Sequence, residues 1–244
     1  MSSTLKLVQT EARLFLRDPM SLSVGLLLPT VVLIGLGAVP MLREPSAEFG
    51  GVRFIDYFAP SLIVMCVGVV GLTNLPVMMA TYREQGVLRR MRTTPVHPGR
   101  LLLAQLLVNL GAALVSTLLV VAAGRIAYGV PLPENPLGFA AAFLLGIGAV
   151  FAIGMLVAAL APTIRAATSI ASVLFMAAMF FGGVYIPRFM LPDAVVRIGD
   201  YMPPGVQALL DTWDGAAPSA VQLLVMGATA VVAGVLAGRM FRWE

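Results

Sequence analysis

The strongest constraint on this chain is a set of six long runs that contain no Asp, Glu, Lys or Arg. Each run has 22 to 30 residues, and a helix of that length, rising about 1.5 Å per residue, crosses the roughly 30 Å hydrocarbon core of a bilayer. The backbone amides of a lipid-exposed segment must bond within that segment, and none of the runs alternates like a barrel strand. The sequence therefore predicts an all-α integral membrane protein with six transmembrane helices. The predicted spans are Pro19–Leu42, Tyr57–Tyr82, Leu101–Gly124, Asn135–Ile164, Ala166–Pro187 and Gly215–Gly238.

The composition supports this assignment and excludes several other classes of protein. Of the 244 residues, 59% are hydrophobic and 11% are charged, whereas about 25% of the residues of a soluble domain are charged. This excludes an ordinary cytosolic globule, a disordered chain and a nucleic-acid-binding module. The single histidine leaves no His-rich metal site, and the only lysine, Lys6, does not follow the glycine-rich loop of a P-loop ATPase. We therefore expect no cofactor in this chain and no ATP hydrolysis by it.

The charged residues between the spans predict the orientation of the chain. Six spans place both ends of the chain on one side of the membrane. If that side is the cytoplasm, 11 of the 16 cations and 4 of the 12 acids are cytoplasmic. Cytoplasmic loops normally carry an excess of Lys and Arg. The expected topology is N-in and C-in, which also accounts for the net charge of +4 without a nucleic-acid partner.

The stretch before the first span, residues 4–18, has helical periodicity. Lys6, Thr10, Arg13 and Arg17 lie on one face, and apolar side chains lie on another. This pattern favours a helix in the membrane interface, with its basic face toward lipid headgroups, over an unstructured cytosolic tail.

The segment between the second and third spans, residues 83–100, carries five arginines and one acid. Val87, Leu88 and Met91 form an apolar edge at helical spacing, and Pro95 closes the helix. We predict a short helix on the cytoplasmic surface that offers its apolar edge and basic face to a partner. A loop that only sets the topology would explain the arginines but not the apolar edge.

The outer segment Arg188–Asp214 is too apolar for a free loop and too interrupted to cross the membrane. Pro192 and the run Pro203-Pro204-Gly205 divide it. Two short helices that dip into the outer interface fit this pattern best.

Three motifs together give the chain a family resemblance. They are Glu11–Pro19, ending in Leu-Arg-Asp-Pro; residues 83–95, with Arg-Glu-Gln-Gly-Val-Leu at the start and Arg-Thr-Thr-Pro at the end; and Phe181–Pro187, followed by Leu191-Pro192 and Pro204–Leu210. With them, essentially the whole chain resembles the membrane permease subunit of type-2 ATP-binding-cassette (ABC) exporters. That class includes daunorubicin-type drug efflux permeases and polysaccharide exporters.

The resemblance implies a single transmembrane domain, residues 1–244, in the cell membrane of a prokaryote. Residues 4–18 would be its interfacial helix, residues 83–95 its coupling helix and residues 187–214 an outer re-entrant helical hairpin between spans five and six. Two permeases, either two copies or sibling chains, would pair in the lipid, each on a cytoplasmic ABC ATPase subunit that binds ATP and Mg²⁺. The exported substrate would be a lipophilic small molecule of drug or antibiotic type, or a lipid-linked one. Polysaccharide or glycolipid export is the alternative.

The resemblance also implies two sets of functional residues. The first set couples the permease to the ATPase; Glu84 is expected to meet the ATPase, but it could equally pair with Arg83, Arg89 or a helix N-terminus. The second set, on spans two and five, lines the substrate route, with ordinary helix packing as the competing explanation. The coupling residues are Arg83, Glu84, Val87, Leu88, Arg89, Arg90, Met91 and Arg92. The pathway residues are Met65, Thr73, Asn74, Met78, Met79, Ser172, Phe175, Met176, Met179, Phe180 and Tyr185.

Several alternatives stay open at the level of sequence. Interhelical hydrogen bonds explain the polar residues Asn74, Gln105 and Asn109 as well as contact with cargo does. A stand-alone carrier or channel would need its own energy coupling or a polar pore, and the spans contain no internal charge. A membrane enzyme would need paired acids, or a Ser or Cys with a base, at depth. A membrane assembly factor would need no transport at all.

Overall fold

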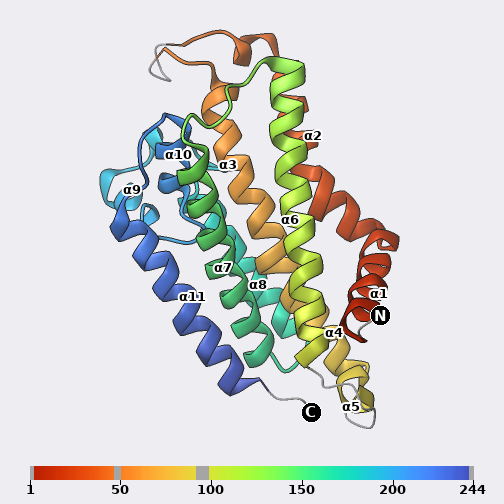
Figure 1. Cartoon of the computed structure of the whole chain (residues 1–244). Helices are drawn as coiled ribbons and strands as arrows, with labels where there is room; N and C mark the ends of the chain where they lie inside the picture. The colour runs from red at the N-terminus through yellow and green to blue at the C-terminus, as the bar shows by residue number, and fades with distance from the viewer. Residues whose placement is uncertain (1–2, 47–50, 92–98, 242–244) are drawn as a thin grey trace.

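The computed structural model describes residues 3–46, 51–91 and 99–241, and over these residues the chain is a bundle of helices (Figure 1). The described part contains no strand, only an isolated bridge between Pro45 and Arg53. The helical elements are α1 (Ser3–Arg17), η1 (Ser21–Leu27), α2 (Leu28–Ala38), η2 (Pro40–Arg43), α3 (Phe54–Gly68), η4 (Val69–Asn74), α4 (Leu75–Glu84), α5 (Val87–Met91), α6 (Gly99–Tyr128), α7 (Pro136–Leu160), α8 (Ile164–Phe181), η5 (Arg188–Met190), α9 (Asp193–Gly199), α10 (Val206–Trp213) and α11 (Ala220–Met240).

Six of these helices or stacked elements are long and apolar enough to cross a membrane, which confirms the predicted number of spans. Span one consists of η1 and α2, span two of α3, η4 and α4, and the other spans of α6, α7, α8 and α11. The marked ends of the chain lie toward the end of the bundle that carries α5, with α9 and α10 toward the opposite end (Figure 1). This agrees with both ends lying on one side of the membrane. Which end faces the cytoplasm stays a prediction.

Spans two and four form the centre of the bundle and are the most buried of the six. Helix α7 packs along α11 and also against η4 and α10. Two glycines of α7 permit close backbone approach: a β-carbon on Gly154 would collide with the carbonyl oxygen of Gly71, and one on Gly146 with that of Pro204. The absence of a side chain at these positions brings α7 against span two at one level and against the α9–α10 connection at another.

Spans one and two each contain a π-helical segment just before a proline. The segment η1 precedes Pro29, and η4 precedes Pro76. Proline has no N–H for the carbonyl four residues earlier, and its ring crowds that carbonyl. The helix accordingly widens into a π turn at this point. Because η1 and η4 pack against each other, the two widened turns lie side by side.

The connection between spans four and five lies earlier in the chain than the charge-free runs indicate, at residues 161–163 instead of at Arg165. Helix α7 ends at Leu160, four residues before the predicted end of its span, and α8 already begins at Ile164. The hydroxyl oxygen of Thr163 accepts a hydrogen bond of 3.1 Å from the N–H of Ala166. Thr163 is therefore an N-cap, and Arg165 lies inside α8 rather than in a loop.

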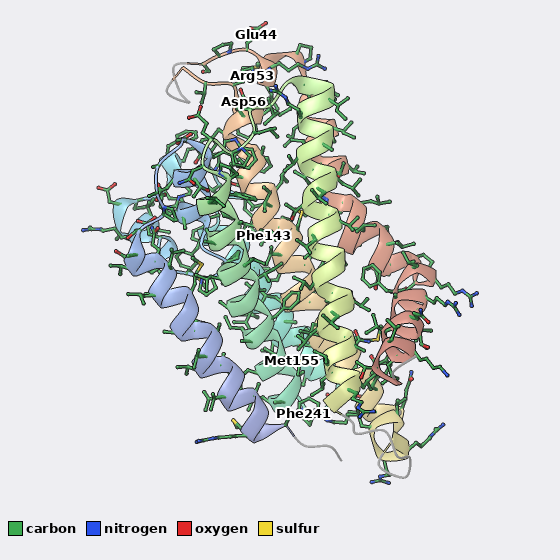
Figure 2. The ribbon with its side chains drawn as sticks, in the orientation of Figure 1. Glu44, Arg53, Asp56, Phe143, Met155 and Phe241 are labelled. Atoms are coloured by element: carbon green, nitrogen blue, oxygen red, sulfur yellow. The ribbon has the colours of Figure 1, made fainter. Side chains whose placement is uncertain are left out.

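Arg53 and Asp56 form an ion pair at the end of the bundle opposite α5 (Figure 2), and Arg53 also bonds to span three. The Arg53 Nε donates to the Asp56 carboxylate at 2.7 Å, and Arg53 Nη1 donates to the carbonyl of Tyr128 at 2.9 Å. The hydrogen bond to Asp56 raises the pKa of the Arg53 guanidinium. The pair thus joins the start of α3 to the end of α6.

Candidate functional site

The predicted coupling residues divide between the end of span two and a short separate helix. Arg83 and Glu84 are the last two residues of α4, and the other described members form α5. Gly86, with a φ of 68°, makes the turn between the two helices; glycine adopts this left-handed conformation without steric cost. Arg92 and Pro95 lie outside the described residues.

Val87 and Leu88 of the predicted apolar edge of α5 pack onto the bundle instead of facing outward. Leu88 is only 1% exposed and belongs to a cluster with Met79, Tyr82 and Leu101. The chain's own core therefore covers Leu88, and a contact of Leu88 with a partner stays a prediction. Arg89 and Arg90 of the same helix are exposed.

Arg83 and Glu84 form hydrogen bonds to the backbone between spans four and five. We name these four residues, Arg83, Glu84, Ala161 and Ile164, the clasp. Arg83 Nη1 donates to the carbonyl of Ala161 at 2.6 Å, and the Glu84 carboxylate accepts from the N–H of Ile164 at 2.6 Å. The Arg83 guanidinium also lies 5.3 Å from the ring centroid of Phe241, within cation–π range. Figure 2 shows Phe241 at the same end of the bundle as Met155 of α7. The clasp therefore connects span two to the beginning of span five.

A groove of about 510 Å³ lies where the two π segments meet. Its apolar wall comes from valine and methionine side chains and Gly25, on spans one and two and at Met20 just before span one. Its polar lining consists of Asp18, Ser21, Thr73, Asn74 and Thr81. An apolar cleft with a few placed polar groups is the usual form of a small-molecule site.

A buried carboxylate fixes α1 to the bundle, and sequence reasoning did not predict it. The Glu11 carboxylate accepts hydrogen bonds of 2.6 Å from both the Tyr82 hydroxyl and the Gln105 side-chain amide. Burial raises the pKa of Glu11, although both hydrogen bonds act in the opposite direction. Glu11 is the one acid of α1, whose other charged residues are basic, and this was the signal in the sequence.

This carboxylate is one end of a polar chain that reaches the groove. Asn109 donates to the Gln105 amide oxygen at 3.2 Å and accepts from Asn74 at 3.4 Å. Ser21 contacts the Asn74 oxygen at 3.3 Å and donates to Asp18 at 2.5 Å. Interhelical hydrogen bonds therefore account for Gln105 and Asn109, while Asn74 both joins the chain and lines the groove.

The comparison with known families decides the general class of this molecule. The family model described as ABC-2 type transporter matches residues 3–205. The chain belongs to the ABC-2 type transporter family. It is thus a membrane permease of an ABC transporter, a kind of protein that works with an ABC ATPase subunit. Its six apolar helices make it a multi-pass membrane protein. None of the curated proteins compared with it matches.

The pathway residues predicted for this permease do not form one surface. Met79 and Met179 are each 1% exposed and pack in the core, so their place on a substrate route stays a prediction. Thr73, Asn74 and Met78 line the groove. The remaining positions are half-buried (Met65, Phe175 and Phe180) or exposed on or after α8 (Ser172, Met176 and Tyr185).

The segment between spans five and six contains the two predicted short helices, α9 and α10. Helix α10 packs against α7 and α3. Arg188 is 5% exposed, pairs with Asp200, and donates its backbone N–H to the Tyr57 hydroxyl at 3.1 Å. These contacts tie the segment to span two. Its entry into the outer membrane interface stays a prediction.

Proposed function

We propose that this permease exports a lipophilic small molecule, of drug or antibiotic type or lipid-linked, across the cell membrane of a prokaryote. The energy comes from ATP hydrolysed with Mg²⁺ in a separate ABC ATPase subunit, and the chain itself is a non-catalytic subunit. Both of its ends lie in the cytoplasm, where α5 meets the ATPase.

The clasp is the observation that carries this proposal. Helix α5 exposes Arg89 and Arg90 at the end of the bundle and is joined to α4 through Gly86. The last residues of α4 in turn hold Ala161 and Ile164 at 2.6 Å each. A force applied to α5 by a closing ATPase would therefore reach spans two and five together.

The groove supports a lipophilic cargo. Its walls are mainly apolar, and they include Met20 and Met78. Methionine is flexible and polarisable, which suits a surface that accepts varied apolar shapes. A long polysaccharide would instead require a continuous hydroxyl-binding surface, so we rank polysaccharide or glycolipid export second.

The outer face of α8 supports pairing with a second permease, either another copy or a sibling chain. Ser169, Ser172 and Met176 are exposed on this helix, and its mean hydropathy is the lowest of the six spans. Exposed hydroxyls inside a membrane are better covered by protein than by lipid tails. We therefore place the partner permease against α8.

Affinity purification of the chain from its native membrane in mild detergent tests this function. The expected result is a stoichiometric P-loop ATPase, and vesicles containing the complex should export a lipophilic substrate only with ATP and Mg²⁺. A hydrolysis-deficient ATPase is the control. If crosslinked preparations contain no ATPase, the proposal fails and a membrane assembly factor becomes the better explanation.

A further inference from the structure

The groove between spans one and two presents hydrogen-bond acceptors. Its lining, which is entirely described, contains one carboxylate, that of Asp18, and no basic side chain. A ligand that complements this surface must bring donors, a positive charge or both.

The three hydroxyls of the groove use their protons within the chain. Thr73 donates to the carbonyl of Val69, and Thr81 donates to that of Val77 at 2.8 Å. The Ser21 hydroxyl donates to Asp18 at 2.5 Å. A hydroxyl has one proton and two lone pairs, so these oxygens offer lone pairs to a ligand.

Asn74 is oriented by its neighbours in the polar chain. Its amide nitrogen donates to the Asn109 oxygen at 3.4 Å, and its own oxygen is 3.3 Å from the Ser21 hydroxyl. The amide NH₂ is thus directed toward span three, and its orientation is fixed before any ligand binds.

Asp18 supplies the negative charge. It accepts from the N–H groups of Met20 at 3.3 Å and Ser21 at 3.0 Å. The hydrogen bond from the Ser21 hydroxyl is the main reason why the pKa of Asp18 is lowered, so the group is ionised at neutral pH. Each carboxylate oxygen keeps further acceptor capacity, because a carboxylate has about four lone-pair sites.

We propose that this groove binds the ammonium head of a cationic amphiphile, with Asp18 as its counter-ion and the Thr73 oxygen as a further acceptor. The apolar tail lies along Val24, Gly25 and Val69. This inference rests on the proposed transport function and names its substrate class: a lipophilic amine rather than an anionic or uncharged lipophile.

Binding of radiolabelled dodecylammonium to the purified permease in phosphatidylcholine nanodiscs at pH 7 tests the proposal. Dodecanol and dodecyl sulfate are competitors with the same tail, and empty nanodiscs give the background. We expect saturable binding that unlabelled dodecylammonium displaces and the two competitors do not. The assay contains no ATPase, so a lack of dodecylammonium binding would not contradict ATP-driven transport. Conversely, a pull-down without an ATPase would not contradict the binding result.

The substitution Asp18→Asn removes the charge and keeps one acceptor oxygen for the N–H of Ser21, since Asn is as good an N-cap as Asp. We expect it to weaken dodecylammonium binding about tenfold. The matched control is Asp214→Asn, an exposed acid after α10, which should bind like the wild type. Equal affinity in Asp18→Asn and wild type, or equal displacement by dodecyl sulfate, would overturn the proposal.

A second pair of variants tests the acceptor oxygens without changing the charge. Thr73→Val should weaken binding severalfold. Thr229→Val is the control, because Thr229 on α11 donates to the carbonyl four residues earlier in the same way and lies away from the groove. If nanodiscs rich in phosphatidylethanolamine block binding, and vesicles show no ATP-dependent export of dodecylammonium, the groove holds a lipid head and the assignment to cargo is wrong.

Discussion

The carboxylate of Glu84, the last residue of α4, accepts a 2.6 Å hydrogen bond from the N–H of Ile164, the first residue of α8 and 80 positions further along the chain. The N-terminus of a helix carries partial positive charge, which favours an anion there. Thr163 already caps this helix through Ala166. Glu84 is therefore not needed to start α8, and its main contribution is to join spans two and five.

Loss of this junction should uncouple transport more than it destabilises the fold. In Glu84→Ala we expect the amount of substrate exported per ATP hydrolysed to fall about fivefold or more, with a nearly unchanged melting temperature. Glu84→Gln, which keeps an acceptor oxygen, should be intermediate. Reconstituted vesicles measure both rates, with the exposed outer acid variant Glu44→Ala as the control. If Glu84→Ala exports as much substrate per ATP as the wild type, the clasp has no role in coupling.

Reversing the charge of the exposed face of α5 should weaken ATPase docking. The double variant Arg89→Glu, Arg90→Glu changes two side chains that point away from the bundle, so the permease should insert and fold normally. We expect its recovery of ATPase in a pull-down to drop at least tenfold, because like charges placed across an interface disfavour it. Arg125→Glu with Arg197→Glu makes the same charge change on exposed residues toward the opposite end. Equal losses in the two double variants would point to net charge instead of docking.

Leu88 should behave as a core residue rather than a contact residue. Because it is 1% exposed within its cluster, Leu88→Ala should lower the free energy of unfolding by about 2–5 kcal/mol. Thermal denaturation in detergent measures this loss. ATPase recovery, expressed per folded permease, should stay near that of the wild type; a selective loss of docking with full stability would restore the interpretation drawn from sequence.

The spans could be predicted from sequence because the bilayer itself enforces them. Any charge-free run long enough to cross hydrocarbon must satisfy its backbone as a helix, and each of the six runs corresponds to a helical span whose ends lie within six residues of the predicted ones. Pro29 and Pro76 were the sequence signal for the two π turns, but the positions of the charge-free runs alone do not predict them. Periodicity likewise identified the apolar edge of α5 without showing which surface covers it.

The polar chain could not be predicted in the same way. Glu11 and Gln105 are 94 positions apart, and no spacing rule relates residues on different helices. Their pairing depends on how α1 packs against α6. Composition suggested only that polar residues at depth need partners.

Glu11 should make stability depend on pH in a defined direction. A carboxyl group whose pKa is raised on folding binds more protons in the folded state, so the stability it contributes is present below its ordinary value of 4.5. That contribution is lost as the pH rises through the raised pKa. Glu11→Gln cannot titrate; relative to this variant, the melting temperature of the wild type should fall between pH 4.5 and neutrality. Glu44→Gln should follow the wild type, and parallel curves for wild type and Glu11→Gln would contradict the assignment.

Alanine variants of two methionines one helical turn apart on α8, Met176 and Met179, should distinguish a packing role from a functional one. Met179 is 1% exposed and packs over Gly68 together with Phe175, whereas Met176 is 62% exposed. Met179→Ala should therefore cost about 2–5 kcal/mol of unfolding free energy, and Met176→Ala less than about 0.5 kcal/mol. If the exposed face of α8 meets a second permease, Met176→Ala should instead reduce crosslinking between permeases or change which cargo is exported. Full stability, pairing and cargo profile in Met176→Ala would show that this face meets only lipid.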